Sequence, residues 1–363
     1  MGRASIIIPF KDAASTIKEC LQSIQEQTEP DFEALLIDDG SSDKGPGLVS
    51  EVAQQDGRIR LLANPGKGLV SALNFGLQQA VGQALFRMDA DDIMHARRLE
   101  MQLEHLRRVE ISSCRVELMG SPGAGMEEYI RWQNALLSEE QIRSHRYVEC
   151  PVLHPTIAFR ASLLESQTNL YAQGPYPEDY ELVLRWISQD CSIQKLEESL
   201  LFYRCHDKQL SRIDDRYSRR AFHDLRRRYL RKDSWLQGRL KDRAPVVWGA
   251  SRQSRRRFED HFPGLRPEYF VDIKPSLLGA IRGSATGAHS RPGGCGVPRE
   301  SSDAKRAQKQ RALPAIKSPE QLFEDPARPF VLVYVNSRGA RPIIEAALEE
   351  HGYRAGESYL CIG

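Results

Sequence analysis

The sequence predicts an α/β fold with a mostly parallel sheet and helices on both faces. Two observations carry this prediction. Up to residue 92, short apolar runs alternate with stretches whose apolar residues recur at helical spacing, which is the pattern of strands alternating with helices. Two of the apolar runs end in clustered aspartates, which places these side chains at the carboxyl ends of strands, where sheets of this class bind ligands.

The first half of the chain alternates regularly. We expect strands at residues 5–10, 34–37, 58–64 and 84–92, because each is a short apolar run, and helices at 13–27, 47–55 and 69–80. Turn-forming residues separate these elements, among them the Gly-Ser-Ser of 40–42 and the turn at 65–68. Strands joined in this way by helices favour parallel pairing.

The alternation of strand and helix patterns is less regular between residues 112 and 175. Residues 121–125 read as a loop, 127–142 as a pair of helices, and "HPTIAFR" at 154–160 as a strand. A turn then leads into a helix within 174–189, and a basic helical region at 213–240 closes the first domain, which we take as residues 1–240.

The second domain, residues 245–363, reads as a small Rossmann-like α/β unit. It offers strands near 244–251, 268–275, 329–337 and 358–362, and helices at 253–262 and 339–351. Residues 279–310 are rich in Gly, Ser, Arg and Pro without periodicity, so we expect a flexible insertion. The dinucleotide fingerprint is broken, because Ser251 and Ser254 follow Gly249 where glycines are needed, so a packing, acceptor-binding or partner-binding role is favoured.

Composition sets the protein class. With 363 residues, 40% hydrophobic and 28% charged, the chain is typical of a globular protein, and we expect no nucleic-acid partner. No run reaches the roughly 18 apolar residues of a membrane span. Arginine-rich stretches at 219–232 and 252–257 leave peripheral membrane contact open. Seven cysteines without a CxxC pair favour a reduced compartment, so we expect a cytoplasmic protein.

The stretch "FRMDADDI" gathers Asp89, Asp91 and Asp92 within four positions at the end of a strand. Carboxylates this close repel one another, so a solvated turn, a cation or a positively charged partner must offset the repulsion. Carboxylate oxygens suit Mg²⁺ or Mn²⁺, whereas the spacing excludes an EF-hand and no P-loop sequence occurs.

Three further acidic or basic positions allow a structural and a functional interpretation. In "IDDGSSD", Asp39 either belongs to an Asx turn whose helix cap is Asp43 or Ser42, or accepts a hydrogen bond from a ligand N–H. Asp179 lies in a first helical turn, where a carboxylate serves as a cap or as a general base. His206 is either an exposed polar residue or a ligand of metal or phosphate.

Seven segments in order over residues 4–212 resemble the family 2 glycosyltransferases, which are inverting enzymes of the GT-A fold. The matching segments are "SIIIPFKDA", "DDGSSD", "NPGKGLVSALNFGL", "FRMDADDI", "HPTIAFR", "PEDYELVLRW" and "YRCHDKQLS". The resemblance implies a GT-A, nucleotide-diphospho-sugar transferase fold with a Rossmann-like mixed sheet, followed by the small C-terminal α/β domain. It also implies transfer of a sugar from a nucleotide donor, most simply a UDP-sugar, to an acceptor hydroxyl.

The resemblance also implies roles for individual residues. Pro9 and Phe10 correspond to the first wall of the nucleotide pocket, Asp39 to the carboxylate that reads the base, and Asp89 to the ribose side of the D-x-D pair. Asp91 corresponds to the direct ligand of Mn²⁺ or Mg²⁺, His206 to a further ligand of the metal or diphosphate, and Asp179 to the catalytic base. Leu73 stands where many relatives have an arginine, so that diphosphate contact is either missing or made by Lys67.

Two further segments, "CRVELMGSPGAGMEEYIRWQNALLSEEQI" and "VVWGASRQSRRRF…FVDIKP", extend the likeness over nearly the whole chain. They resemble an animal branch of this family described as beta-1,3-N-acetylglucosaminyltransferase-like. This resemblance implies UDP-N-acetylglucosamine as the donor and a galactose-terminated acceptor. Two rival hypotheses stay open at this point: a non-catalytic scaffold or sensor that binds nucleotide sugars, and a nucleotidyltransferase. The second usually has a Gly-rich basic loop after the first strand, and "IIIPFKDAAST" lacks one.

Overall fold

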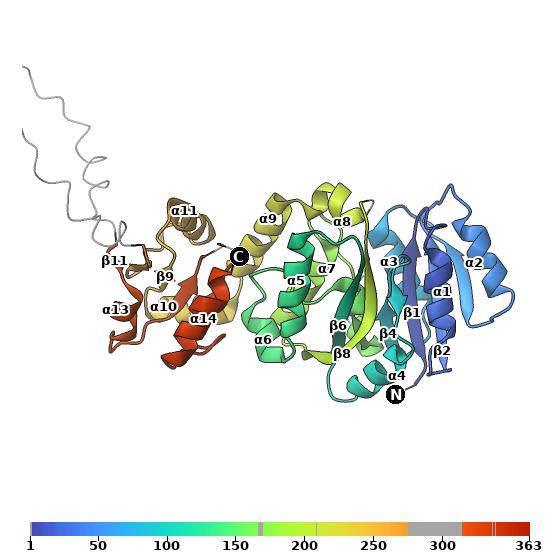
Figure 1. Ribbon diagram of the computed structural model, residues 1–363, viewed down its shortest axis with the longest axis horizontal. Helices are drawn as coiled ribbons and strands as arrows, with labels where there is room; N and C mark the ends of the chain where they lie inside the picture. The colour runs from blue at the N-terminus through green and yellow to red at the C-terminus, as the bar shows by residue number, and fades with distance from the viewer. Residues whose placement is uncertain (1, 166–169, 208, 275–313, 336, 338) are drawn as a thin grey trace, which may run out of the picture. The chain divides into compact units, whose positions relative to one another are not determined.

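The computed structural model describes residues 2–165, 170–207, 209–274, 314–335, 337 and 339–363. The contacts within the chain form two compact units, Met1–Tyr229 and Leu230–Gly363, and Figure 1 shows both with labels on many of their helices and strands. The insertion predicted at 279–310 lies outside the described residues.

The first unit contains a mixed eight-stranded sheet with the order β3-β2-β1-β4-β7-β6-β8-β5. The four strands β3, β2, β1 and β4 are parallel neighbours, β7 is antiparallel to β4 and β6, β6 and β8 are parallel, and β5 is antiparallel to β8. The strands are β1 (Ala4–Phe10), β2 (Phe32–Asp38), β3 (Ile59–Ala63), β4 (Ala84–Arg87), β5 (Ile93–Met94), β6 (Ile111–Gly120), β7 (Ala158–Arg160) and β8 (Ile193–Cys205). The predicted α/β class with a Rossmann-like mixed sheet is confirmed.

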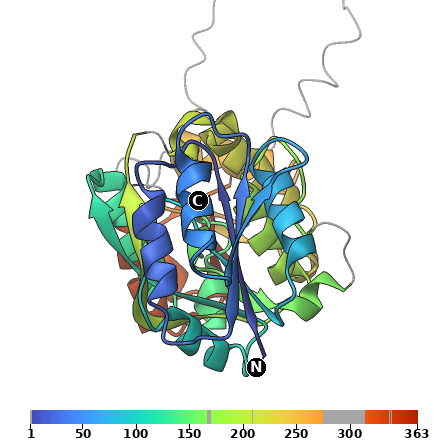
Figure 2. The same ribbon diagram turned by 90° about the vertical axis from the view of Figure 1, so that its right-hand side faces the viewer.

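Helices cover both faces of this sheet, and Figure 2 shows them on either side of the blue strands. The helices are α1 (Ile17–Gln25), α2 (Gly45–Ala53), α3 (Leu69–Gln79), α4 (Arg98–His105), α5 (Ala124–Ala135), α6 (Glu139–Ser144), α7 (Glu178–Ser188), α8 (Leu210–Ile213) and α9 (Arg219–Leu230). The short 3₁₀ helices are η1 (His154–Thr156), η2 (Ala161–Leu164) and η3 (Asp215–Tyr217).

Successive side chains of β1 point to opposite faces of the sheet, so the strand packs in the core on both faces. Ile6, Ile8 and Phe10 belong to the apolar cluster that also contains the buried residues of α1 and Val49 of α2. Ile7 points to the other face, where α3 approaches so closely that a Cβ on Gly76 would meet Ile7 Cγ2 at 2.7 Å and Ile37 Cδ1 at 2.8 Å. Glycine at 76 therefore permits the close packing of α3 on the sheet.

Three boundaries differ from the sequence prediction. The strand predicted at 84–92 ends at Arg87, so Asp89, Asp91 and Asp92 lie in a turn before β5. The strand predicted at 154–160 begins only at Ala158, because η1 occupies His154–Thr156. Residues 111–120, for which the pattern predicted no strand, form β6.

The second unit contains a five-stranded parallel sheet with the order β11-β10-β9-β12-β13. Its elements are α10 (Ser234–Asp242), β9 (Val246–Trp248), α11 (Arg252–His261), β10 (Phe270–Val271), β11 (Ile316–Lys317), α13 (Pro319–Phe323), β12 (Val331–Val333), α14 (Ala340–Glu350) and β13 (Tyr359–Cys361). The smaller C-terminal α/β unit is therefore present.

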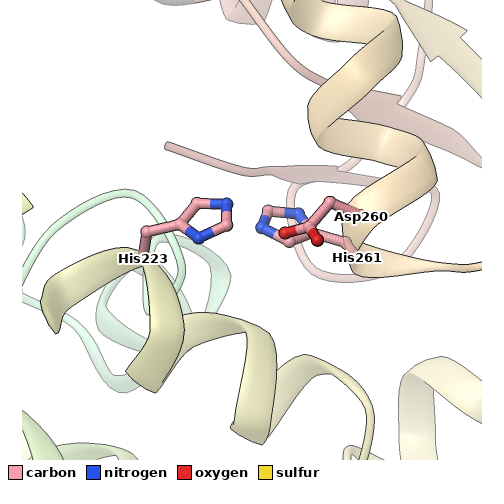
Figure 3. Close-up of side chains that lie close together, drawn as sticks. All are labelled: His223, Asp260 and His261. Atoms are coloured by element: carbon pink, nitrogen blue, oxygen red, sulfur yellow. The ribbon is translucent and has the colours of Figure 1, made fainter. Parts of the chain in front are cut away.

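Local contacts fix the turn that follows β9. Ser251 caps α11 by accepting from Ser254 N, and Asp272, which follows β10, accepts from Ala250 N at 3.0 Å. The last turn of α11 carries Asp260 and His261 (Figure 3), and His261 Nδ1 lies 2.9 Å from the hydroxyl of Tyr334. Within the part of the chain that the structure describes, no helix combines the length and the apolar character needed to cross a membrane.

Candidate active site

The residues singled out in the first unit gather where the parallel strands end. β1, β2 and β4 are neighbours in the sheet, and their last residues are Phe10, Asp38 and Arg87. Loops leaving these ends meet at one edge because parallel strands point the same way. The main chain ties the loops together there, since Asp39 N donates to Phe10 O at 2.9 Å.

The acidic turn after β4 brings three carboxylates together. Asp89, Asp91 and Asp92 each offer an oxygen, and these atoms lie within 4.8 Å of one another. The side chains of Asp89 and Asp91 are 30% and 28% exposed, whereas Asp92 is buried at 1%. Burial and the charges of Asp89 and Asp91 raise the pKa of Asp92 well above its usual range. The three carboxylates of this turn therefore repel one another when ionised, and a bound cation would reduce that repulsion.

Arg204 on β8 holds this turn in place. Its main-chain N–H donates to Asp92 Oδ1 at 2.9 Å, and its Nε donates to the carbonyl oxygen of Asp91 at 2.7 Å. Asp92 Oδ2 is buried and accepts no hydrogen bond from the described residues. A buried carboxylate oxygen without a donor, next to two partly exposed carboxylates, fits a hard divalent cation such as Mg²⁺ or Mn²⁺.

His206 reaches the same turn from the segment that follows β8. Its Nε2 lies 2.8 Å from Asp91 Oδ2, so the structure brings together the two residues predicted to bind the metal. Gln209 fixes this segment, because its side-chain amide donates to the Arg204 carbonyl at 2.8 Å and to the Tyr203 hydroxyl at 3.0 Å. An imidazole and carboxylates placed together are a common donor set for a transition-metal cation.

The start of α7 carries two adjacent acids with different surroundings. Glu178, only 1% exposed, accepts from the Tyr217 hydroxyl at 2.7 Å and from Arg216 Nη1 at 3.4 Å. Asp179 is half-buried, and its Oδ1 accepts from Tyr180 N at 2.7 Å. Burial, and next the charge of Glu178, raise the pKa of Asp179 to about 7. A carboxylate that takes up a proton near neutral pH is suited to general base catalysis.

Asp39 organises the turn at 64–68. It accepts from Asn64 Nδ2 at 2.7 Å and from Gly68 N at 2.8 Å, and Gly68 needs its glycine because its φ is +86°. Lys67 lies exposed on this turn. A carboxylate has about four acceptor positions, so Asp39 keeps acceptor capacity for a ligand N–H.

Pro9, Phe10 and Leu73 are buried. Phe10 packs in the apolar cluster with α1, so at this point the strand end offers mainly its main chain to a ligand. Asp43 accepts from Gly45 N at 2.8 Å and from Ala14 N at 2.7 Å. The helix cap predicted at Asp43 or Ser42 is wrong, because the N-cap position of α2 is Lys44 and has no side-chain cap.

Sequence reasoning gave no role to two arginines of the site, Arg87 and Arg204. Arg87 forms a buried ion pair with Asp89, and Arg204 holds the acidic turn. The sequence does contain a signal for both residues, since each arginine lies inside an apolar strand run, "ALFRM" or "LLFYRC". A buried arginine needs a partner of opposite charge or several acceptors, so such a residue indicates a nearby acidic group or carbonyl oxygens.

Comparison with known proteins finds similarity in the first unit. Residues 5–167 match the family model "Glycosyl transferase family 2". An uncharacterized glycosyltransferase of Haemophilus influenzae is 27% identical over 221 residues, which is 58% of this chain and 67% of the relative. The UDP-Glc:alpha-D-GlcNAc-diphosphoundecaprenol beta-1,3-glucosyltransferase WfgD of Escherichia coli is 39% identical over 109 residues, 30% of this chain and 42% of that protein.

A solved structure shares the fold. S. aureus TarS 1-349 in complex with UDP superposes with a TM-score of 0.50 at 17% identity, over 64% of this chain and 66% of that one. The match with the first three curated relatives spans 67%, 28% and 28% of their lengths. Over residues 5–167 this chain is therefore similar to the glycosyltransferase family 2 model, and its first unit has a GT-A-like fold.

Proposed function

We propose that this chain, which matches the glycosyltransferase family 2 model over residues 5–167, is an inverting, metal-dependent glycosyltransferase that moves a sugar from UDP to an acceptor hydroxyl. One observation carries the proposal. Burial raises the pKa of Asp179 to about 7, the charge of Arg87 lowers it, and Arg87 also forms an ion pair with Asp89 of the acidic turn; this supports a proton acceptor and a cation-binding group in one site.

In the proposed transfer reaction, Asp179 acts on the acceptor hydroxyl. The acceptor hydroxyl forms the new bond to the anomeric carbon of the donor, the bond from that carbon to the UDP oxygen breaks, and Asp179 takes the hydroxyl proton. Attack from the face opposite the leaving group inverts the anomeric configuration. Glu178 is held by Tyr217 and Arg216, which leaves Asp179 as the base.

The Mn²⁺ or Mg²⁺ ion would be held by Asp91 and His206, with the buried carboxylate of Asp92 beside them. Asp89, in the same cluster, would serve the ribose side of the donor. When bound, such a cation supplies positive charge that stabilises the departing diphosphate. The three aspartates suit either ion, and the imidazole of His206 favours Mn²⁺ over Mg²⁺ because Mg²⁺ prefers oxygen ligands.

Three finer points belong to this proposal. The name of WfgD, with its UDP-Glc donor, supports a UDP-sugar as donor. The resemblance to the animal branch supports N-acetylglucosamine as the sugar and a carbohydrate as the acceptor. The six cysteines of the described chain are free and buried, which supports a cytosolic location.

The test compares Asp179→Asn with Asp190→Asn, which alters an exposed acid just beyond the end of the same helix. Transfer is measured with a panel of UDP-sugars, Mn²⁺ and a panel of glycoside acceptors. Asp179→Asn should lower transfer by about a hundredfold or more while the nucleotide still binds, because general base catalysis contributes about 10²–10⁴-fold. Asp190→Asn should behave as the unmodified chain.

Two results contradict the proposal. If Asp179→Asn transfers as fast as the unmodified chain, the assigned base is wrong. If the unmodified chain binds UDP with Mn²⁺ but transfers to no acceptor, the rival interpretation as a non-catalytic nucleotide-sugar scaffold or sensor replaces it.

A further inference from the structure

The first turn of α7 carries three acids, two of which are buried. Glu178, Asp179 and Glu181 belong to this turn, and Glu178 and Glu181 are 1% and 3% exposed. Carboxylates are rarely buried to this degree unless hydrogen-bond donors or opposite charges compensate them. Asp179 is half-buried, and its Oδ1 accepts from its neighbour Tyr180 N. The donors that hold the two buried acids therefore also fix the turn that carries Asp179.

The donors for Glu178 come from η3. The Tyr217 hydroxyl donates to Glu178 Oε1 at 2.7 Å, and Arg216 Nη1 lies 3.4 Å from Glu178 Oε2. Arg216 is itself held, because its Nη2 donates to Asp214 Oδ2 at 2.9 Å. Asp214 also accepts from Arg216 N as the N-cap of η3. Glu178 is thus held by a hydroxyl and a guanidinium from a segment whose own residues are bonded to one another.

The other contacts of this turn come from α9. The Tyr229 hydroxyl donates to Glu181 Oε1 at 2.7 Å. Phe222 lies against Tyr180, with the two ring centroids 5.7 Å apart. Tyr180 is fully buried, and its hydroxyl donates to the Arg146 carbonyl at 2.6 Å. α9 therefore contacts the turn at the residue after Asp179 and at the next one.

The same helix reaches the loop that leads into α7. The Cζ atom of Arg228 lies 5.9 Å from the ring centroid of Tyr176, which is two positions before the helix starts. Tyr176 folds back onto its own loop, because its hydroxyl donates to the Gln173 carbonyl at 3.1 Å. A Cβ on Gly174 would meet this ring at 2.1 Å, so a side chain there would displace it. Contacts to α9 thus lie on both sides of Asp179 along the chain.

We propose that residues 214–229, which include η3 and most of α9, form a buttress that positions Asp179 for the transfer. Tyr217 and Tyr229 are its positioning residues, and they hold the first turn of α7 through its two buried acids. The proposal rests on the proposed function, because it takes Asp179 as the base. It goes beyond that function by giving a role to a segment in which the sequence pattern indicated only a basic helical region. All these contacts lie within the first unit.

A positioning role and a purely structural role predict different kinetics. A structural role alone would lower stability and leave the rate of the folded protein unchanged. A positioning role also lowers kcat, because a base displaced by about 1 Å loses its alignment with the hydroxyl whose proton it takes. The KM for the donor should not change, since the predicted donor residues Asp39 and Asp89 follow other elements, β2 and β4.

The test compares Tyr217→Phe and Tyr229→Phe with Tyr359→Phe, each of which removes one hydroxyl and keeps the ring. The Tyr359 hydroxyl donates to Glu349 Oε1 at 3.0 Å in the second unit, so this control loses the same kind of bond outside the first unit. With UDP-sugar, Mn²⁺ and a glycoside acceptor, the two buttress variants should lower kcat about tenfold or more and keep the donor KM within about twofold. The control should keep both constants while its melting temperature falls comparably.

Amide hydrogen exchange gives a readout that needs no catalysis. Tyr180 N donates to Asp179 Oδ1 at 2.7 Å and Glu181 N donates to the Pro177 carbonyl at 3.1 Å, so these two amides report on the turn. Their exchange is followed by NMR in the full chain. It should become about tenfold faster in the two buttress variants, because the loss of a hydrogen bond to a buried carboxylate lets the turn open more often. The control should exchange as the unmodified chain does.

Two results overturn the proposal. One is a buttress variant that loses stability as the control does and keeps its kcat. The other is exchange of the two α7 amides at the rate of the unmodified chain. If Tyr217→Phe does not fold, the same two readouts on Tyr229→Phe decide. If exchange becomes faster as expected but the unmodified chain transfers no sugar, the hold of the buttress on α7 stands and the proposed function fails.

Discussion

The proposed role of Asp179 as the base predicts how transfer depends on pH. A base must be ionised to accept a proton, and burial together with Glu178 raises the pKa of Asp179 to about 7. With one such group, about a tenth of the chains carry an ionised base at pH 6 and about nine tenths at pH 8, so kcat/KM should rise nearly tenfold over this range.

The assay is UDP release at low donor concentration between pH 5.5 and 9, at a fixed saturating concentration of cation. The Glu178→Gln variant makes the assay more specific. Removing the neighbouring negative charge should lower the midpoint of the acidic limb by about one pH unit. A limb with a midpoint near pH 4, as for an exposed carboxyl, would refute the assignment of Asp179 as a base with a raised pKa. So would a Glu178→Gln variant whose limb moves upward.

The pH dependence of stability gives an independent test of the raised pKa of Asp179. The native state holds a proton on Asp179 more tightly than the unfolded chain, whose pKa is the usual 3.8. Between about pH 4 and 7 the folded chain therefore loses stability through this group as the pH rises. Asp179→Asn should raise the melting temperature at pH 8 but not at pH 4, the opposite of its effect on transfer.

Four other changes test separate parts of the account. His206→Ala should weaken Mn²⁺ binding about tenfold or more, measured as the lost rise in melting temperature on adding Mn²⁺, because the imidazole lies on Asp91; an unchanged rise excludes it as a ligand. Asn64→Ala should raise the Kd for UDP several-fold with little effect on kcat, because Asp39 loses a 2.7 Å donor, and calorimetry with UDP checks this. Tyr217→Phe should lower the free energy of unfolding by about 1 kcal/mol, since buried Glu178 loses its 2.7 Å donor, as urea denaturation would show. Gly76→Ala should cost about 1–3 kcal/mol by the same method, because the new Cβ would press on Ile7 and Ile37; a neutral result would mean that α3 can shift.

The first half of the fold was predictable because its signals are local. The strands β1 to β4 are short, mainly apolar runs, and each helix between them has its own periodicity. β6 was missed because Ser112 and Ser113 interrupt the apolar run, yet both are buried and bonded, Ser112 to His105 and Ser113 to Thr156. Antiparallel insertion of β7 between β4 and β6 is a long-range pairing that no local pattern contains.

The candidate site was predictable in its residue types and less so in its contacts. The motifs named Asp91, Asp179 and His206, and the structure places His206 on Asp91 across 115 positions of sequence. No spacing rule reveals that Tyr217 would bind Glu178 or that buried Arg87 would pair with Asp89. These partners come from packing, because each buried charge is matched by whichever opposite group the fold brings near.

The configuration of the product tests the proposed inverting transfer directly. The full chain is incubated with anomerically pure UDP-N-acetylglucosamine, Mn²⁺ and a panel of glycoside acceptors, and the product is followed by NMR through its anomeric coupling. The account predicts a glycoside of inverted configuration that is formed by the unmodified chain and by Asp190→Asn, and is absent with Asp179→Asn. A product of retained configuration, or equal product from Asp179→Asn, would contradict it.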